Sequence, residues 1–431
     1  MIQKKNIFNQ IINLIKNKNY EVALNLLDKI KIDEKSKNEV FKLKAFIYIQ
    51  LGEWKKSIFF NERLIDLREE GNPQIYNMLG AAYFNLGNLN KSIEKFKNSI
   101  KYDEKNLLAY DNIGIAYKRL GNFEQSIKYF VKALEINSNA KHINRSLIDI
   151  FNFYDTKDLG DIKICELNNK ISHLEKKTNL KSFNEIINLL KESENVLNKE
   201  YQIFYNATQI VKSNNLNLNC ERHLNIFNKF NLIPRYCFNC FKVQVQTINI
   251  AELIKLYFYF NRLNLKNNNI RKCTIELRNK ISGNYKGYIF SNSINDAEQI
   301  LNLVTKDLIN NKIHYKKIEI KHGCTEYYDK FPKYKSIEQN NFSNIYKSSW
   351  EKIENEYDIK HLVEEQNRER IISPTLNKFN LSDFLIIKNW AYYSQIIGDD
   401  SFAHIFNTNG NSLFIRNILK DQIDFRKQDL N

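Results

Sequence analysis

Large apolar residues recur every three or four positions through residues 5–140, in blocks that repeat after 34 or 35 positions. This spacing predicts pairs of antiparallel helices. Each block has a glycine at the turn, Gly52, Gly87 or Gly121, and small residues where the two helices meet. One hairpin cannot bury its own apolar face, so at least three must stack. The matched positions include Tyr76 with Tyr110, Gly80 with Gly114, Tyr83 with Tyr117, Ser92 with Ser126 and Phe96 with Phe130.

These blocks resemble the tetratricopeptide repeat family. The resemblance implies an α-solenoid whose concave groove binds a peptide or a helix of another protein. We expect the array, with a capping helix after Lys141, to occupy residues 1–155. Lys118 and Arg119 could pair with an acidic group of such a ligand. The implied groove positions on the first helices are Asn77, Ala81, Phe84, Asn85, Asp111, Ile115, Lys118 and Arg119.

The pattern changes along the rest of the chain. Residues 156–235 are polar with one apolar helical stripe, which predicts a helical linker. Apolar and polar residues then alternate in four segments separated by two helical stripes, so residues 236–325 have the order βαββαβ. This order indicates an α+β domain of the ferredoxin-like, split βαβ type. Residues 326–431 are predicted to form a mostly helical extension, in which Leu381–Ile397 packs on the sheet or on the repeats.

One face of the predicted sheet suggests a second binding function. The segment Lys286-Gly-Tyr288-Ile-Phe290 resembles the basic-Gly-aromatic-x-aromatic motif of the RNA-recognition motif family. In that family the aromatic rings stack on bases and the basic residue meets phosphate. The resemblance implies RNA binding on the open face, by Lys242, Arg278, Lys286, Tyr288 and Phe290. Packing of these rings under the C-terminal segment is the alternative, and it would exclude RNA from this face.

Four cysteines flank the predicted strands. Cys237 and Cys240 precede the first strand, Cys273 opens the second, and Cys324 follows the fourth. In a split βαβ sheet these three positions lie at one edge, so the four thiols could hold zinc or an iron–sulfur cluster. Ordinary buried cysteines or a redox dithiol are the alternatives.

Charge and composition limit the expected partners and cellular compartment. The 431 residues carry a formal charge of +16, with 25 Lys and Arg against 17 Asp and Glu in residues 1–150, and 19 against 9 in residues 201–330. This surplus suits an acidic partner or nucleic acid, but it also suits a solvated surface. The sequence contains no apolar run that could span a bilayer and no signal peptide, so we expect a cytoplasmic protein.

No recognisable catalytic motif stands out, which makes an enzyme the less favoured class. The sequence therefore predicts first an interaction adaptor or scaffold that binds a protein partner in the repeat groove. An RNA-binding adaptor and a metal-binding C-terminal domain of unknown activity are the alternatives, and no cofactor is firmly predicted.

Overall fold

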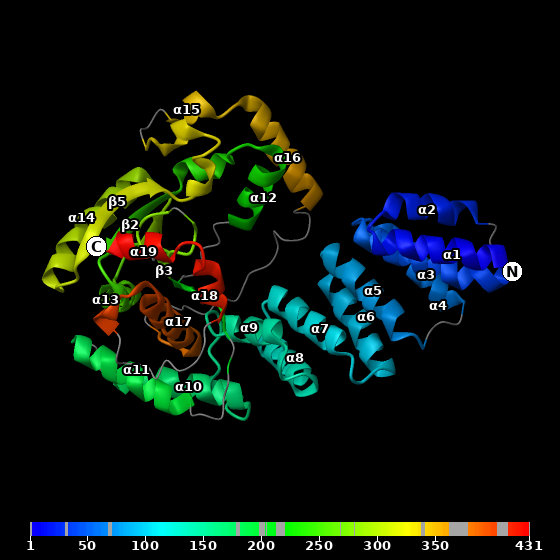
Figure 1. Cartoon of the computed structure of the whole chain (residues 1–431), viewed down its shortest axis with the longest axis horizontal. Helices are drawn as coiled ribbons and strands as arrows, with labels where there is room; N and C mark the ends of the chain where they lie inside the picture. Colours follow the sequence, from blue (N-terminus) through cyan, green and yellow to red (C-terminus); the bar gives the residue numbers. More distant parts are fainter. Residues whose placement is uncertain are drawn as a thin grey trace. The chain divides into compact units, whose positions relative to one another are not determined.

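The protein divides into two compact units, the first ending at Leu147 and the second beginning at Ile148 (Figure 1). The fold was obtained as a computed structural model. It describes residues 2–30, 33–67, 71–177, 182–197, 203, 205–212, 220–267, 269–279, 281–337, 341–361, 378–402 and 413–430. The predicted C-terminal extension thus includes residues 338–340, 362–377, 403–412 and 431, which lie outside the described residues.

The first unit is a succession of helix pairs. Each helix packs on its partner and then on the first helix of the following pair. A further helix follows the fourth pair where the sequence predicts the cap. The helices are α1 (Ile2–Lys16), α2 (Tyr20–Lys29), α3 (Glu34–Gln50), α4 (Trp54–Asp66), α5 (Pro73–Asn85), α6 (Leu89–Tyr102), α7 (Leu107–Arg119), α8 (Phe123–Ile136) and α9 (Lys141–Ile150).

Glycine and asparagine define the turns within the pairs. Gly87 and Gly121 have φ values of 80° and 74°, in the left-handed region where glycine carries no steric cost. The next residue caps the second helix. Asn88 accepts a hydrogen bond from the amide of Lys91, and Asn122 accepts one from the amide of Gln125. The Gly-Asn dipeptide therefore ends one helix and starts the next at the same place in both repeats.

The two helices of a pair approach closely at one glycine. A Cβ atom built on Gly80 would lie 2.7 Å from the Phe96 ring, and one on Gly114 would lie 2.6 Å from the Phe130 ring. A buried serine on the second helix reinforces each contact. The hydroxyls of Ser57, Ser92 and Ser126 donate to the carbonyls of Ala45, Gly80 and Gly114 at 3.0, 2.8 and 2.7 Å. The small residues thus allow both close packing and a repeated hydrogen bond.

We predict that Gly114→Ala destabilises the first unit. The added methyl group has no space beside Phe130, and overpacking of this kind costs about 1–3 kcal/mol. Better helix propensity offsets up to about 1 kcal/mol of that cost. Urea unfolding of the full chain, followed by circular dichroism, should show an earlier helical transition. Gly71→Ala is the control, because a Cβ there meets nothing within 4 Å. An unchanged transition for Gly114→Ala would contradict the packing account.

The second unit contains a five-stranded sheet in which every described strand pair is antiparallel. The order across the sheet is β1-β3-β4-β2-β5. The strands are β1 (Gln209–Lys212), β2 (Phe241–Thr247), β3 (Arg271–Ile275), β4 (Tyr285–Ser291) and β5 (Tyr315–His322). The last four, with α13 (Ile250–Arg262) and α14 (Ile294–Asn310), follow the predicted order of elements.

Strand β1 corrects one prediction. Residues 209–212 lie inside the segment predicted to be a helical linker, yet they pair with β3 at the edge of the sheet. The strand has four residues, of which Ile210 and Lys212 are buried. Four residues are too few to show a clear period, and the strand depends on a hydrogen-bonding partner some 60 positions later in the chain. Pairing of this kind is not visible in local sequence.

Three helices cover one face of the sheet. α13 packs on β3 and β4, α14 on β2 and β5, and α17 (Leu381–Ile397) on β1 and β3 (Figure 1). Gly287 of β4 marks this face, because a Cβ atom there would meet Leu256 and Phe260 of α13. Leu381–Ile397 therefore does pack on the sheet, on the same face as the crossover helices.

A buried ion pair fixes α17 to the edge strand. Lys212 Nζ of β1 donates to Asp383 Oδ2 at 2.6 Å, and the two side chains are 3% and 0% exposed. Asp383 also accepts from the backbone amide of Asn380, which caps the helix. Removing one member of such a pair leaves a buried charge without compensation and typically costs about 3–5 kcal/mol. The pair thus holds together segments that are 171 positions apart.

The remaining described helices surround this core. α12, α15, α16 and three short 3₁₀ turns enclose a separate cluster of buried aromatic residues, apart from the core between the sheet and its helices. We call it the second aromatic cluster, and it includes Phe227, Phe238, Tyr327, Tyr334 and Trp350. None of the described helices combines the length and apolar character needed to cross a bilayer. The bounds are α10 (Lys163–Lys177), α11 (Phe183–Leu197), α12 (Cys220–Phe230), α15 (Asn341–Ile345), α16 (Ser348–His361), α18 (Leu413–Leu419) and α19 (Ile423–Leu430).

Candidate functional site

The predicted groove residues lie on α5 and α7, the first helices of two successive pairs. Side chains cross directly between them and to α9. The guanidinium of Arg119 lies 4.4 Å from the centroid of the Phe84 ring. Lys118 Nζ donates to the carbonyl of Ser146 at 3.5 Å, and His142 Nε2 lies 3.1 Å from Asp111 Oδ2. We call this face of α5, α7 and α9 the groove face.

Two acceptor atoms on α5 and α7 have no hydrogen-bond donor among the described residues. Asn77 Oδ1 and Asp111 Oδ1 are buried, and neither accepts a hydrogen bond from any described residue. The two residues are 34 positions apart, so they occupy the same place in consecutive repeats. A buried acceptor without a donor costs roughly 1–3 kcal/mol, which makes two equivalent cases informative.

The electrostatics of Asp111 support this interpretation. Burial raises the pKa of its carboxyl group, while the charge and hydrogen bond of His142 act in the opposite direction. Asp111 is 7% exposed, whereas the side chain of His142 is 67% exposed. Keeping this buried carboxylate charged therefore costs free energy, which the exposed His142 only partly offsets. Asn85 is different, because it is exposed and its amide donates to the Ala81 carbonyl of its own helix.

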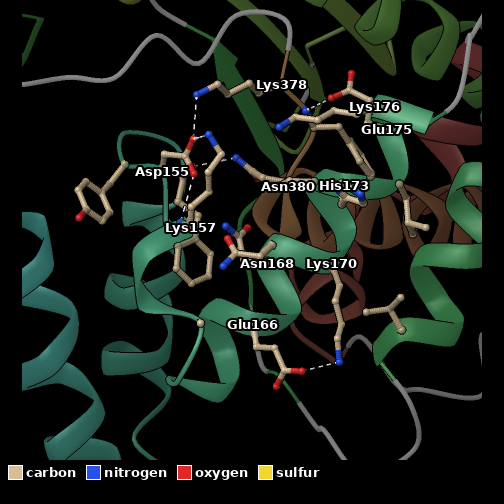
Figure 2. A pocket seen from close by; sticks show the side chains of 18 residues that line it. Asp155, Lys157, Glu166, Asn168, Lys170, His173, Glu175, Lys176, Lys378 and Asn380 are labelled. Atoms are coloured by element: carbon tan, nitrogen blue, oxygen red, sulfur yellow. Dashed lines mark hydrogen bonds and ion pairs between the residues drawn. The ribbon is translucent and has the colours of Figure 1, made fainter.

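A cavity of about 790 Å³ lies beside α10 in the second unit. Figure 2 shows its charged side chains paired with one another along the wall. Asp155 contacts Lys157 at 3.0 Å and Lys378 at 3.6 Å, and Glu166 contacts Lys170 at 2.5 Å. Burial would raise the pKa of Asp155, but these two lysines outweigh it and hold the pKa below its ordinary value.

Buried polar groups behind this wall have structural partners. The carboxylate of Glu175 accepts from the amide of Phe379 at 2.6 Å, and burial raises the pKa of this carboxyl group. Asn168 Oδ1 accepts from the amide of Leu381, and its amide group donates to Thr156 at 2.8 Å. These bonds attach α10 to the segment before α17. They account for the polar wall without a ligand.

The sheet face opposite the helices is more closed than the sequence predicts. Tyr288 is 6% exposed and Lys286 is 3% exposed. Lys286 Nζ contacts Glu276 Oε2 at 2.8 Å, in a pair that is 4% exposed on both sides. The ammonium groups of Lys242 and Lys272 lie 5.0 and 5.9 Å from the centroid of the Tyr288 ring.

These contacts correct the roles predicted for Lys286 and Tyr288. A ring flanked by two ammonium groups and closed to solvent cannot stack on a base, and a lysine in a buried ion pair does not reach a phosphate backbone. Phe290 is half-buried, and Arg278 has a 51% exposed side chain that contacts Glu276 at 2.8 Å. The sequence motif failed here because long polar side chains pack against one another on this face.

The predicted metal ligands are not assembled. Within the described part of the chain, no three His, Cys, Asp or Glu side chains are grouped so that they could hold a metal ion. Cys273 is opposite Gly287 in the β3–β4 register and so faces the helix layer. Cys237 Sγ lies 3.4 Å from the Tyr327 hydroxyl, in the second aromatic cluster. The prediction of a four-cysteine site is therefore wrong.

The thiols nevertheless differ in character. A hydrogen bond from Cys237 lowers the pKa of Cys324, although burial opposes this effect. The same hydrogen bond, together with burial, raises the pKa of Cys237. Burial raises the pKa of Cys240 to about 12. Cys324 is thus the half-buried thiol in this group that most readily forms the reactive thiolate.

We predict that iodoacetamide at neutral pH modifies Cys324 well before Cys237, Cys240 or Cys273. Cys237→Ala should slow alkylation of Cys324 severalfold, because it removes the thiol that stabilises the thiolate. Cys273→Ala is the control, since Cys273 faces the helix layer. Peptide mapping by mass spectrometry gives the rates. Equal rates for Cys324 and Cys240, or no effect of Cys237→Ala, would contradict the assignment.

The comparisons with known proteins concern the repeats. A family model described as Tetratricopeptide repeat matches residues 109–140, and one described as TPR repeat matches residues 80–121. No curated protein matches the chain. Residues 80–140 of the first unit therefore contain tetratricopeptide repeats.

Solved structures that are similar to the chain include MamA and two TPR domains. A crystal structure of MamA is 18% identical over 32% of this chain and 81% of its own, with a TM-score of 0.30. The Arabidopsis OM64 TPR domain is 23% identical over 26% and 93%, with a TM-score of 0.25. The first TPR of Spaghetti (RPAP3), bound to the HSP90 peptide SRMEEVD, is 23% identical over 28% and 94%, with a TM-score of 0.26.

Proposed function

We propose that the protein is an interaction adaptor whose repeat unit binds a segment of another protein on the groove face. The observation that carries the proposal is the repeated buried acceptor, Asn77 Oδ1 and Asp111 Oδ1, without a donor among the described residues. Backbone N–H groups of an extended or helical segment are donors of the right kind. A segment that lies across α5 and α7 would pass both residues, because they are at equivalent repeat positions. It would reach the two buried oxygens once the side chains that cover them move aside.

The neighbouring side chains support a polypeptide ligand. Phe84 provides apolar surface under the guanidinium of Arg119, and arginine and aromatic residues are enriched where protein interfaces gain most of their affinity. Lys118 and Arg119 add positive charge to α7, the helix that also carries Asp111. The groove face therefore offers acceptors, an aromatic ring and both signs of charge within two helices. These groups together suit a peptide, which offers backbone N–H donors as well as apolar and charged side chains.

We predict that Asn77→Ala and Asp111→Ala each weaken binding of the protein partner by about 1–3 kcal/mol. Asn77→Ala should leave the stability of the repeat unit unchanged or raise it, because it removes a buried acceptor that has no described donor. Asp111→Ala also removes the contact with the exposed His142, which is worth at most about 1 kcal/mol, so it should change the stability by no more than about that amount. Loss of binding with retained stability distinguishes a ligand contact from a packing residue. The partner is first identified by mass spectrometry of proteins captured on the immobilised full chain, with and without RNase. Affinities are then measured with the purified partner.

Glu135→Ala is the matched control for the change of charge. Glu135 is an exposed residue of α8, a second helix of a pair. It should bind the partner like the natural chain. Equal affinity for all three variants and the natural chain would remove the groove face from the account. Capture that disappears with RNase would instead favour the RNA alternative.

We further infer that residues 236–325 form a ferredoxin-like sheet with one added edge strand. The four strands from β2 to β5 have the order β3-β4-β2-β5, and two crossover helices lie on one face. This is the order of a split βαβ fold. Strand β1, beside β3, is the addition.

A further inference from the structure

A small cavity lies on the polar face of the sheet in the second unit. It measures about 200 Å³. Pockets for drug-sized ligands usually measure about 300–1,000 Å³, so this cavity suits a smaller molecule. Lys242 of β2, Lys272 of β3 and Arg278, which follows β3, line it together with Tyr288. Strands β2 and β3, with the segment after β3, therefore bring three cations to one small space.

The carboxylates nearby do not balance these cations. Glu276 accepts from Arg278 and also from Lys286, both at 2.8 Å, so one buried carboxylate serves two cations. Glu326 lines the cavity but its side chain is 52% exposed, and it lies 3.9 Å from Arg278. Four cations thus face two carboxylates here. Buried charges in proteins are normally paired, so the surplus needs an explanation.

Lys242 and Lys272, which both contact the Tyr288 ring, are the two cations without a carboxylate partner among the described residues. Lys242 is 8% exposed, and its ammonium donates to the carbonyl of Gly323 at 2.9 Å, which is a neutral partner. Lys272 is half-buried and its ammonium group contacts the Tyr288 ring, but this ammonium group has no hydrogen bond or ion pair with any residue that the structure describes. Burial lowers the pKa of both lysines, and repulsion from Arg278 adds to this effect, while the carboxylate of Glu326 opposes it. A negative ligand would relieve all of these costs at once.

We propose that this cavity binds a small oxyanion, a phosphate or carboxylate group of a low-molecular-weight ligand, between Lys242, Lys272 and Arg278. Lysine ammonium groups and the arginine guanidinium are the usual donors to such groups. The cavity is too small for a nucleotide with its sugar and base, and the Tyr288 ring is closed to stacking. The ligand is therefore a small anion rather than a polynucleotide. This site lies in the second unit and does not depend on the proposed repeat groove.

Isothermal titration calorimetry with the full chain tests the proposal. The probes are inorganic phosphate, malonate and a single-stranded oligonucleotide. We expect saturable binding of phosphate or malonate at one site, and which of the two binds identifies the oxyanion. Lys272→Met should weaken that binding about tenfold or more, the effect of losing a charge-assisted hydrogen bond. This lysine has no described hydrogen-bond partner to lose, so its replacement should leave the fold intact.

Two further variants keep the test decisive. Lys242→Met should also weaken binding, and thermal melting shows whether it remains folded. Lys317→Met is the matched control, because Lys317 belongs to β5 and has a 59% exposed side chain paired with Glu319. The proposal fails if neither small anion binds at millimolar concentration, or if Lys272→Met binds as tightly as the natural chain. Oligonucleotide binding that Lys272→Met abolishes, without small-anion binding, would also overturn it and favour RNA.

Discussion

The close approach of a glycine to a phenylalanine ring is the constraint on which the repeat unit depends. Gly80 under Phe96 and Gly114 under Phe130 leave no space for a methyl group. They bring the second helix near enough for the serine hydroxyl to reach the first helix. Because each pair is fixed in this way, successive first helices lie side by side, and side chains such as Arg119 and Phe84 meet between them. The groove face is a consequence of this packing.

Much of the repeat unit could be predicted from sequence, because its contacts are local and recur. The 34-residue offset aligns Gly80 with Gly114 and Ser92 with Ser126, and each pair makes the same contact. The repeat pattern predicted only that Ser92 and Ser126 must be small. The hydrogen bond that each one donates needed the structure, since an apolar pattern says nothing about which carbonyl a hydroxyl reaches.

The second unit shows which structural features the sequence alone does not predict. Strands β2 to β5 alternate clearly enough to be found, whereas β1 requires a partner distant in the chain. The roles of Lys286, Tyr288 and Cys273 failed for a related reason. A motif or a spacing fixes the face of a strand but not what covers it, and here ion pairs and neighbouring lysines do so. His142 was missed as well, because its contact with Asp111 crosses between helices.

The central claim is that a protein partner binds on α5, α7 and α9. Hydrogen–deuterium exchange of the full chain, with and without the purified partner, tests it most directly, since bound amides exchange more slowly. The account predicts added protection in peptides from residues 73–85, 107–119 and 141–147, and none in the sheet. Protection confined to residues 241–322, with the repeats unchanged, would contradict it.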